Sequence, residues 1–364
     1  MSSFFPSLTT VAKGAFATTV GLGTLSAGLL YYGQSYLIYP SAFTQIGDDG
    51  PPAEPASYGL HHELVELKTK DGEILRCYLL PQKKELPKAT KFRSLPKVPI
   101  SAIEGATESG YSEMTDEEVL SQRPTVIMFH GNGGNAGHRI PLGMMFQQVM
   151  RCNVLGVEYR GYGESTGTPS ENGLAIDAVT ALEFVRGDPR LRNTPVILYG
   201  QSIGGAVSID LASRFPGEIS GLILENTFLS LRLLVPHVLP LLGPFRWLCH
   251  QRWESAGKGI PREMNVLLLS GQSDTLVPPK HMKYLRKIFS ARPHTRRTLG
   301  LSPLSISQEG KNEDEVNEER TQFILFPEGT HNNTTAQHGY WNRIGDFVAE
   351  VGKEWREQQK QYRS

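Results

Sequence analysis

The sequence has few cysteines, and this shortage excludes two kinds of protein. Cys77, Cys152 and Cys249 stand far apart along the 364 residues, and no Cys-x-x-Cys pair is present. An odd number of cysteines cannot form a complete disulfide framework, and common zinc sites need paired ligands. A single disulfide stays open as an alternative. We expect three small buried hydrophobic side chains, with no metal ion and no other cofactor.

The chain also lacks an excess of charge of either sign, since it carries 37 basic and 37 acidic side chains. Binding to nucleic acid requires a basic face that neutralises phosphates, so we expect no nucleic-acid partner. A hydrophobic fraction of 39% supplies enough apolar material for a large core. The length fits one large domain or two modest ones.

Charged residues are absent from residues 14–46, which are mostly small and apolar. A cleaved signal peptide, a single-span anchor and a buried helix are the alternatives. We favour the anchor because a bilayer-spanning helix needs about 20 apolar residues and no cleavage site stands out. Lys13 precedes this stretch and Asp48 follows it, which places the N-terminus in the cytosol and the bulk of the chain across the membrane. We expect a single-pass protein of the endoplasmic reticulum or plasma membrane.

Beyond this anchor (residues 1–46) and a proline-rich acidic linker (47–57), residues 58–364 show the pattern of one α/β domain. Two short runs flank Asp71 and Gly72 and predict a hairpin. Continuous apolar runs predict strands buried on both faces of a parallel sheet; they are residues 126–129, 153–157, 196–199, 222–224, 266–269 and 323–326. A helical pattern at residues 173–185 separates two of them. This alternation predicts a mostly parallel sheet with helices on both faces.

Three segments interrupt the alternation. Residues 83–123 and 291–320 are polar and charged, so we expect flexible surface insertions, because such sequences bury too little apolar surface to become ordered. Residues 226–263 are rich in leucine and other large apolar residues, and we expect a small cap segment here, because α/β-hydrolases usually carry an insertion at this point. The cap segment could pack on the sheet or cover an acyl-binding pocket, and both alternatives stay open.

The pentapeptide Gly-Gln-Ser-Ile-Gly at residues 200–204 is the first candidate for catalysis. It directly follows a predicted strand and directly precedes a helical pattern. This is the setting of a nucleophile elbow, in which glycines permit a tight turn that exposes the serine at the end of the sheet. Ser202 is therefore the predicted nucleophile, and an ordinary strand-to-helix turn is the alternative.

A serine nucleophile needs a base and an acid to orient that base. His331 follows the last predicted strand in a glycine-containing loop, and His338 is its nearest competitor. Asp274 follows the preceding predicted strand, with Glu225 as the alternative acid. The order Ser202, Asp274, His331 is the order of α/β-hydrolases.

An acyl-transfer site also needs two N–H donors for the developing oxyanion. The sequence His-Gly-Asn-Gly-Gly-Asn at residues 130–135 follows a predicted strand, and its glycines let backbone N–H groups turn inward. We expect the backbone N–H groups of Asn132 and Ile203 to form the oxyanion hole. A phosphate-binding loop is the alternative, but the spacing of the usual phosphate-binding motifs is absent.

Five segments resemble the Bem46 family of α/β-hydrolases, namely residues 130–139, 159–165, 200–206, 225–228 and 329–332. The resemblance covers most of the chain outside the two insertions. It implies an α/β-hydrolase fold and a membrane-anchored serine hydrolase that uses Ser202, Asp274 and His331. Neighbouring relatives of this family are protein depalmitoylases, which adds palmitoylated proteins to the expected substrates.

The leading functional hypothesis is hydrolysis of carboxylic esters or thioesters, with substrates derived from acyl chains or lipids. A serine peptidase shares the same residues and is the second hypothesis. A membrane-tethered signalling or scaffold protein with weak catalysis is the third. Epoxide hydrolase and dehalogenase chemistry are excluded, because either would need aspartate at position 202.

Overall fold

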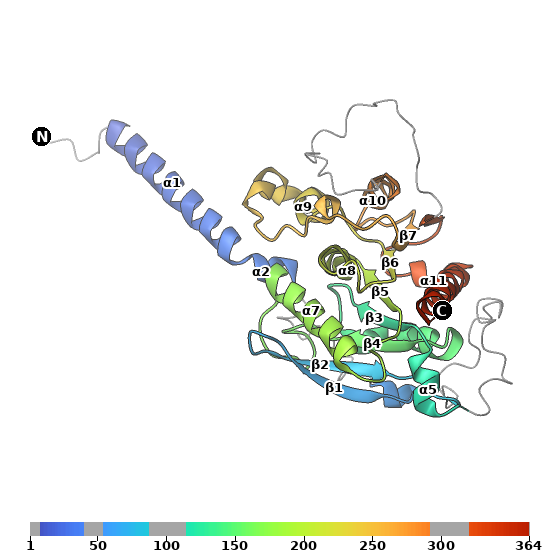
Figure 1. The fold of residues 1–364 in the computed structure, drawn as a ribbon. Helices are drawn as coiled ribbons and strands as arrows, with labels where there is room; N and C mark the ends of the chain where they lie inside the picture. Colours follow the sequence, from blue (N-terminus) through green and yellow to red (C-terminus); the bar gives the residue numbers. More distant parts are fainter. Residues whose placement is uncertain (1–7, 40–53, 87–113, 292–319, 364) are drawn as a thin grey trace, which may run out of the picture.

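The computed structural model describes residues 8–39, 54–86, 114–291 and 320–363. Its centre is an eight-stranded sheet with the strand order β1-β2-β4-β3-β5-β6-β7-β8 (Figure 1). The strands are β1 (Glu63–Lys68), β2 (Ile74–Leu80), β3 (Thr125–Phe129), β4 (Asn153–Val157), β5 (Val196–Gln201), β6 (Gly221–Glu225), β7 (Asn265–Gly271) and β8 (Thr321–Phe326). The β1–β2 and β2–β4 pairs are antiparallel and all others are parallel. The predicted α/β-hydrolase fold and its early hairpin are confirmed.

The central strands are buried on both faces, as their continuous apolar sequences predict. Alternate residues of β3 enter different cores: Ile127 and Phe129 face one cluster, and Val126 and Met128 face the other. Helices supply the rest of each cluster. The helical elements outside the N-terminal region and the cap segment are η1 (Pro55–Tyr58), α5 (Asp116–Ser121), η3 (Ala136–Arg139), α6 (Ile140–Met144), the π-helical turn η4 (Met145–Val149), α7 (Glu171–Gly187), α8 (Ile203–Arg214), α10 (Lys280–Ser290), η7 (Thr334–Ala336) and α11 (Tyr340–Arg363).

Two layers of helices cover the sheet. Helices α7, α8 and α10 contribute buried residues such as Leu174, Val207 and Leu285 to the first core. On the other face, α6, η4 and α11 contribute to the second core, for example through Phe146 and Phe347. Because β3 to β8 run parallel, their carboxyl ends all lie at one edge of the sheet, where ligands bind in open α/β folds.

The three cysteines are buried and unpaired, as predicted for small hydrophobic side chains. The two predicted insertions lie mostly outside the described residues. Within the first of them, however, α5 begins with a capping box at Thr115 and buries Val119 and Leu120. The expectation of a flexible insertion is therefore wrong for this helix, because two apolar residues in an otherwise charged segment suffice to dock it.

The region between β6 and β7 contains three short helical elements, α9 (Leu231–Val238), η5 (Pro240–Leu248) and η6 (Ser255–Gly257). They fall within the predicted cap segment, and Figure 1 draws α9 beside α10. Element η5 leaves large apolar side chains in solvent, since Leu241 is 90% exposed and Trp247 is 65% exposed.

The N-terminal region forms a helix, α1 (Leu8–Tyr32), followed by the short α2 (Gln34–Ile38). Helix α1 projects from the body of the domain (Figure 1) and exposes apolar residues such as Phe16 and Leu29. Among the described residues, no helix is both long enough and apolar enough to cross a membrane. The predicted spanning helix is thus not supported, because about half of the 25 residues of α1 are Gly, Ala or Thr.

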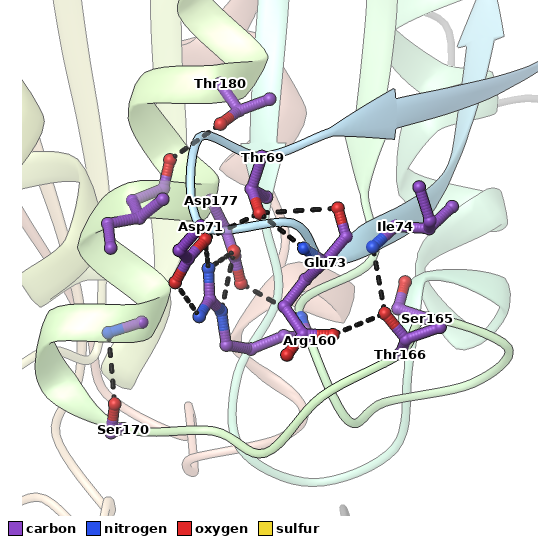
Figure 2. Close-up of polar contacts among 12 residues, drawn as sticks. Thr69, Asp71, Glu73, Ile74, Arg160, Ser165, Thr166, Ser170, Asp177 and Thr180 are labelled. Atoms are coloured by element: carbon purple, nitrogen blue, oxygen red, sulfur yellow. Dashed lines mark hydrogen bonds and ion pairs between the residues drawn. The ribbon is translucent and has the colours of Figure 1, made fainter.

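A buried arginine ties the β1–β2 hairpin to the rest of the domain (Figure 2). Arg160 lies after β4 and donates to both oxygens of Asp71 in the hairpin turn, at 2.7 and 3.0 Å. Its backbone N–H and Nε donate to Asp177 of α7, each at 2.9 Å. Burial raises the pKa of Asp177 to about 6, against the lowering influence of Arg160, whereas the bonds from Arg160 hold the pKa of Asp71 well below its usual range.

The substitution Arg160→Met removes the partner of a buried carboxylate, so we expect the free energy of unfolding to fall by about 3–5 kcal/mol. Urea denaturation measures this change. The control is Arg76→Met, which breaks an exposed ion pair with Glu66 and should cost no more than about 1 kcal/mol. If both variants lost the same free energy of unfolding, the burial of Asp177 would not explain the loss in Arg160→Met.

Candidate active site

Ser202 occupies the turn between β5 and α8 with φ 54° and ψ −118°. A positive φ strains a residue that has a side chain, and the two neighbouring glycines make the turn possible. A Cβ atom at Gly204 would lie 2.1 Å from the carbonyl oxygen of Phe129. At Gly200 it would lie 2.2 Å from the carbonyl oxygen of Gly204. Both positions therefore require glycine, which explains the pentapeptide pattern.

The strained turn is held from the end of β6. The backbone N–H of Ser202 donates to the carbonyl oxygen of Glu225 at 2.9 Å. The Thr227 hydroxyl donates to the carbonyl oxygen of Ser202 at 2.6 Å. These two bonds fix the backbone on both sides of the serine side chain.

The predicted acid and base are in contact. Nδ1 of His331 lies 2.7 Å from Oδ2 of Asp274, and the other carboxylate oxygen accepts from the backbone N–H groups of Leu276 and Val277 at 2.9 and 2.8 Å. Asp274 is buried in the loop after β7, and His331 lies in the loop after β8. A carboxylate that accepts from Nδ1 leaves Nε2 available to receive a proton.

The loop that carries His331 lies against the elbow that carries Ser202. The side chain of Gln201, which precedes the serine, donates through Nε2 to the carbonyl oxygen of His331 at 3.0 Å. All three predicted catalytic residues therefore come from loops at the carboxyl edge of the sheet, on β5, β7 and β8.

The alternative acid, Glu225, has a different environment. Its carboxylate is fully buried and accepts from the hydroxyl of Tyr199 at 2.6 Å, from the hydroxyl of Tyr340, and from Nε2 of Gln201 at 3.2 Å. Burial raises the pKa of Glu225 despite these bonds. Glu225 thus accepts a hydrogen bond from Gln201, whereas the imidazole of His331 is bonded to Asp274. Asp274 is therefore the acid that contacts the base.

The two predicted oxyanion donors come from different loops, one directly after Ser202 and the other after β3. Ile203 is the first residue of α8, and the N–H groups of a first helical turn have no acceptor within the helix. Asn132 follows β3, and its side chain is fixed at both ends: Oδ1 accepts from the hydroxyl of Tyr162 at 2.5 Å, and Nδ2 donates to the carbonyl oxygen of Ile38 at 2.6 Å. Within the described part of the chain, no three His, Cys, Asp or Glu residues are grouped to hold a metal ion.

Sequence reasoning missed the part played by Asn226. Its Nδ2 lies 3.2 Å from the carbonyl oxygen of Thr330, 3.3 Å from that of His331 and 3.0 Å from the hydroxyl of Thr334. Its Oδ1 accepts from the backbone N–H of Gly271 at 2.8 Å, at the start of the loop that carries the acid. Asn226 has φ 45°, a conformation that asparagine tolerates better than most residues. An asparagine directly after a buried strand was the signal available in the sequence.

We expect Thr227→Val to lower kcat/KM about tenfold, which corresponds to about 1.4 kcal/mol of lost transition-state stabilisation, because the carbonyl of Ser202 loses the bond that fixes the elbow. Thr180→Val is the matched control, since it removes a hydroxyl bond to Ile176 within α7, away from the site. Ester hydrolysis and thermal unfolding of both variants are the measurements. A similar loss of activity in both variants would contradict a specific role for Thr227.

Comparisons with known proteins identify relatives of this chain. Residues 121–262 match a family model described as serine aminopeptidase, S33. The chain is 34% identical to protein bem46 of Schizosaccharomyces pombe, over 93% of this chain and 94% of that protein. It is 32% identical to an uncharacterized membrane protein of Saccharomyces cerevisiae, over 94% of this chain and 98% of that one.

Solved structures share the fold at low identity. An esterase from Pyrococcus furiosus superposes with a TM-score of 0.54 at 15% identity, covering 83% of this chain and 97% of the esterase. An α/β-hydrolase from Vibrio vulnificus gives 0.53 at 20% identity, over 79% of this chain and 81% of that one. Both similarities concern the fold. The near full-length match to bem46, together with the elbow at Ser202, shows that the chain belongs to the Bem46 family of α/β-hydrolases.

Proposed function

We propose that this protein is a serine hydrolase that cleaves carboxylic esters or thioesters through an acyl-enzyme. The observations that support the proposal are the strained serine on the elbow and, in a loop bonded to that elbow through Gln201, a histidine whose Nδ1 lies 2.7 Å from a buried aspartate. The three residues follow the carboxyl ends of β5, β7 and β8, and two of their side chains are in contact. A purely structural role would require neither a serine with positive φ nor a histidine bonded to a buried aspartate.

In the proposed reaction His331 takes the proton from the Ser202 hydroxyl as its oxygen attacks the substrate carbonyl carbon. The carbonyl oxygen gains negative charge, which the N–H groups of Asn132 and Ile203 stabilise. The tetrahedral intermediate collapses to the acyl-enzyme, and His331 gives its proton to the leaving alcohol or thiol. Water then attacks the acyl-enzyme by the same route in reverse, while Asp274 keeps the imidazole oriented.

The cap segment favours an acyl-chain substrate. Its exposed apolar residues lie in the element that follows α9, and α9 itself buries Leu231 and Leu234 toward the core. The segment follows β6, the neighbour of β5 in the sheet, and an apolar surface suits an acyl chain better than a polar substrate. We therefore include lipid-derived esters and palmitoylated proteins among the proposed substrates.

The second candidate is a serine peptidase. It is favoured by one observation, the match of residues 121–262 to a family model described as a serine aminopeptidase. Amide hydrolysis uses the same nucleophile and base, so only the substrate separates the two candidates.

Purified wild type and Ser202→Ala should be compared with a fluorophosphonate probe, p-nitrophenyl esters from acetyl to palmitoyl, and aminoacyl p-nitroanilides. We expect probe labelling and ester hydrolysis in wild type, and loss of both in Ser202→Ala. Asp274→Asn should lower kcat by roughly 10³–10⁴, as loss of the orienting acid does in such triads.

Each other outcome points to a different function. Anilide hydrolysis without ester hydrolysis would support the peptidase. A strict preference for the shortest esters would contradict an acyl-chain substrate. Absence of labelling in wild type would favour a catalytically weak scaffold protein.

We also propose that the N-terminal region attaches the protein to a membrane. Helix α1 exposes apolar side chains and carries no acidic residue, and the Saccharomyces cerevisiae relative is named a membrane protein. Tyr31 and Tyr32 at its end are residues that favour the membrane–water interface. No described helix has the length and apolarity of a membrane span. The helix could therefore attach at the membrane surface instead of crossing the membrane, and the two modes of attachment differ in how strongly the protein is held.

Washing membranes that contain the full chain with alkaline carbonate separates the two modes. A single-span anchor predicts that the protein stays in the pellet, whereas surface attachment predicts release into the supernatant. Recovery of the unwashed protein away from membranes would contradict membrane attachment in either form.

A further inference from the structure

A short N-terminal strap, defined here as residues 34–39, is built into the domain although it belongs to the N-terminal region. Gln34 is 6% exposed and Tyr39 is fully buried, and Tyr39 belongs to the same core as α7 and α8. An anchor that only tethered the domain would not need buried polar side chains at this point. The strap therefore has a role in the domain itself.

Both ends of the strap are bonded to residues of the cap segment. Gln34 donates through Nε2 to the carbonyl oxygen of Leu248 at 2.8 Å and accepts through Oε1 from the backbone N–H of His250 at 3.0 Å. The hydroxyl of Tyr39 accepts from Nε1 of Trp253 at 3.0 Å. These bonds join parts of the chain that are more than 200 residues apart.

The strap also contacts the oxyanion loop, through the residue before Tyr39. The carbonyl oxygen of Ile38 accepts from Nδ2 of Asn132 at 2.6 Å, while Oδ1 of Asn132 accepts from the hydroxyl of Tyr162 at 2.5 Å. The asparagine side chain is thus clamped between the strap and the loop after β4. Its backbone N–H is the proposed oxyanion donor, and such donors act only when their position is set before the reaction.

We propose that the strap is a positioning element of the active site, which sets the oxyanion donor of Asn132 through the carbonyl of Ile38. This inference rests on the proposed function. Gln34 and Tyr39 fix the strap to the cap segment, Ile38 fixes Asn132 to the strap, and Tyr162 completes the clamp. None of the strap residues is a catalytic residue, because the effect of each passes through Asn132.

The test is a double-mutant cycle in the full-length protein with Gln34→Leu, which removes the bonds of the strap to Leu248 and His250, and Tyr162→Phe, which removes the opposite half of the clamp. The substrate is p-nitrophenyl butyrate. We expect each single variant to lower kcat about tenfold with little change in KM, since a misplaced donor weakens the transition state more than the bound substrate. The double variant should lose far less than the product of the two, because both changes release the same asparagine.

Two further variants serve as controls. Tyr39→Phe removes one hydroxyl and keeps the ring, so it should lower kcat in the same direction even if Gln34→Leu folds poorly. Tyr32→Phe changes an exposed residue of the same N-terminal region and should leave kcat unchanged. Thermal unfolding of every variant shows whether the folded protein persists at the assay temperature.

Independent, multiplying effects on kcat would overturn the proposal. So would unchanged kcat in Gln34→Leu and Tyr39→Phe, even with a lowered Tm, because a purely structural contact affects stability alone. If Ser202→Ala keeps the butyrate activity, the proposed function fails and this inference fails with it. If Ser202→Ala is inactive and the cycle is multiplicative, only the role of the strap is lost.

Discussion

The side-chain amide of Asn226, at the end of β6, joins the loops that carry the acid and the base. It donates toward the carbonyl oxygens of Thr330 and His331 and accepts from the N–H of Gly271. The next residue, Thr227, holds the carbonyl of Ser202. Because β6 lies between β5 and β7 in the sheet, two adjacent residues at its end can reach all three loops, so the relative positions of the three loops depend on this strand end.

A network of buried polar side chains around Glu225 also helps to position the three loops, although burying a carboxylate costs stability. Glu225 is fully buried and its pKa is raised, although it accepts bonds from Tyr199, Tyr340 and Gln201. Buried polar groups stabilise a protein only when their bonds are satisfied, but a satisfied network also fixes one arrangement of the core. Here the network fixes Gln201, which contacts the carbonyl of His331. The base is thereby held through its backbone as well as through Asp274.

The sequence predicts much of this arrangement where the signals are local. Continuous apolar runs predict the buried strands, and the glycines around Ser202 predict the elbow because neither position can hold a Cβ atom. Asp274 and His331 were predictable because the ends of neighbouring parallel strands meet at one edge of the sheet. The roles of Asn226 and Thr227 were not, since their bonds reach residues 25 to 108 positions away. Buried Val119 and Leu120 likewise show that two apolar residues can dock a helix inside a charged segment.

The N-terminal region illustrates why such long-range bonds escape sequence reasoning. Absence of charge over residues 14–46 predicts an apolar environment, but hydropathy does not distinguish a lipid environment from a protein core. Gln34 and Tyr39 are ordinary polar residues in the sequence, and their partners are backbone groups and an indole more than 200 residues away. The acceptor for Asn132 is the backbone carbonyl of Ile38, which any amino acid at position 38 would supply. A contact through the backbone leaves no residue preference in the sequence, so only the folded structure can reveal that the N-terminal region reaches the oxyanion loop.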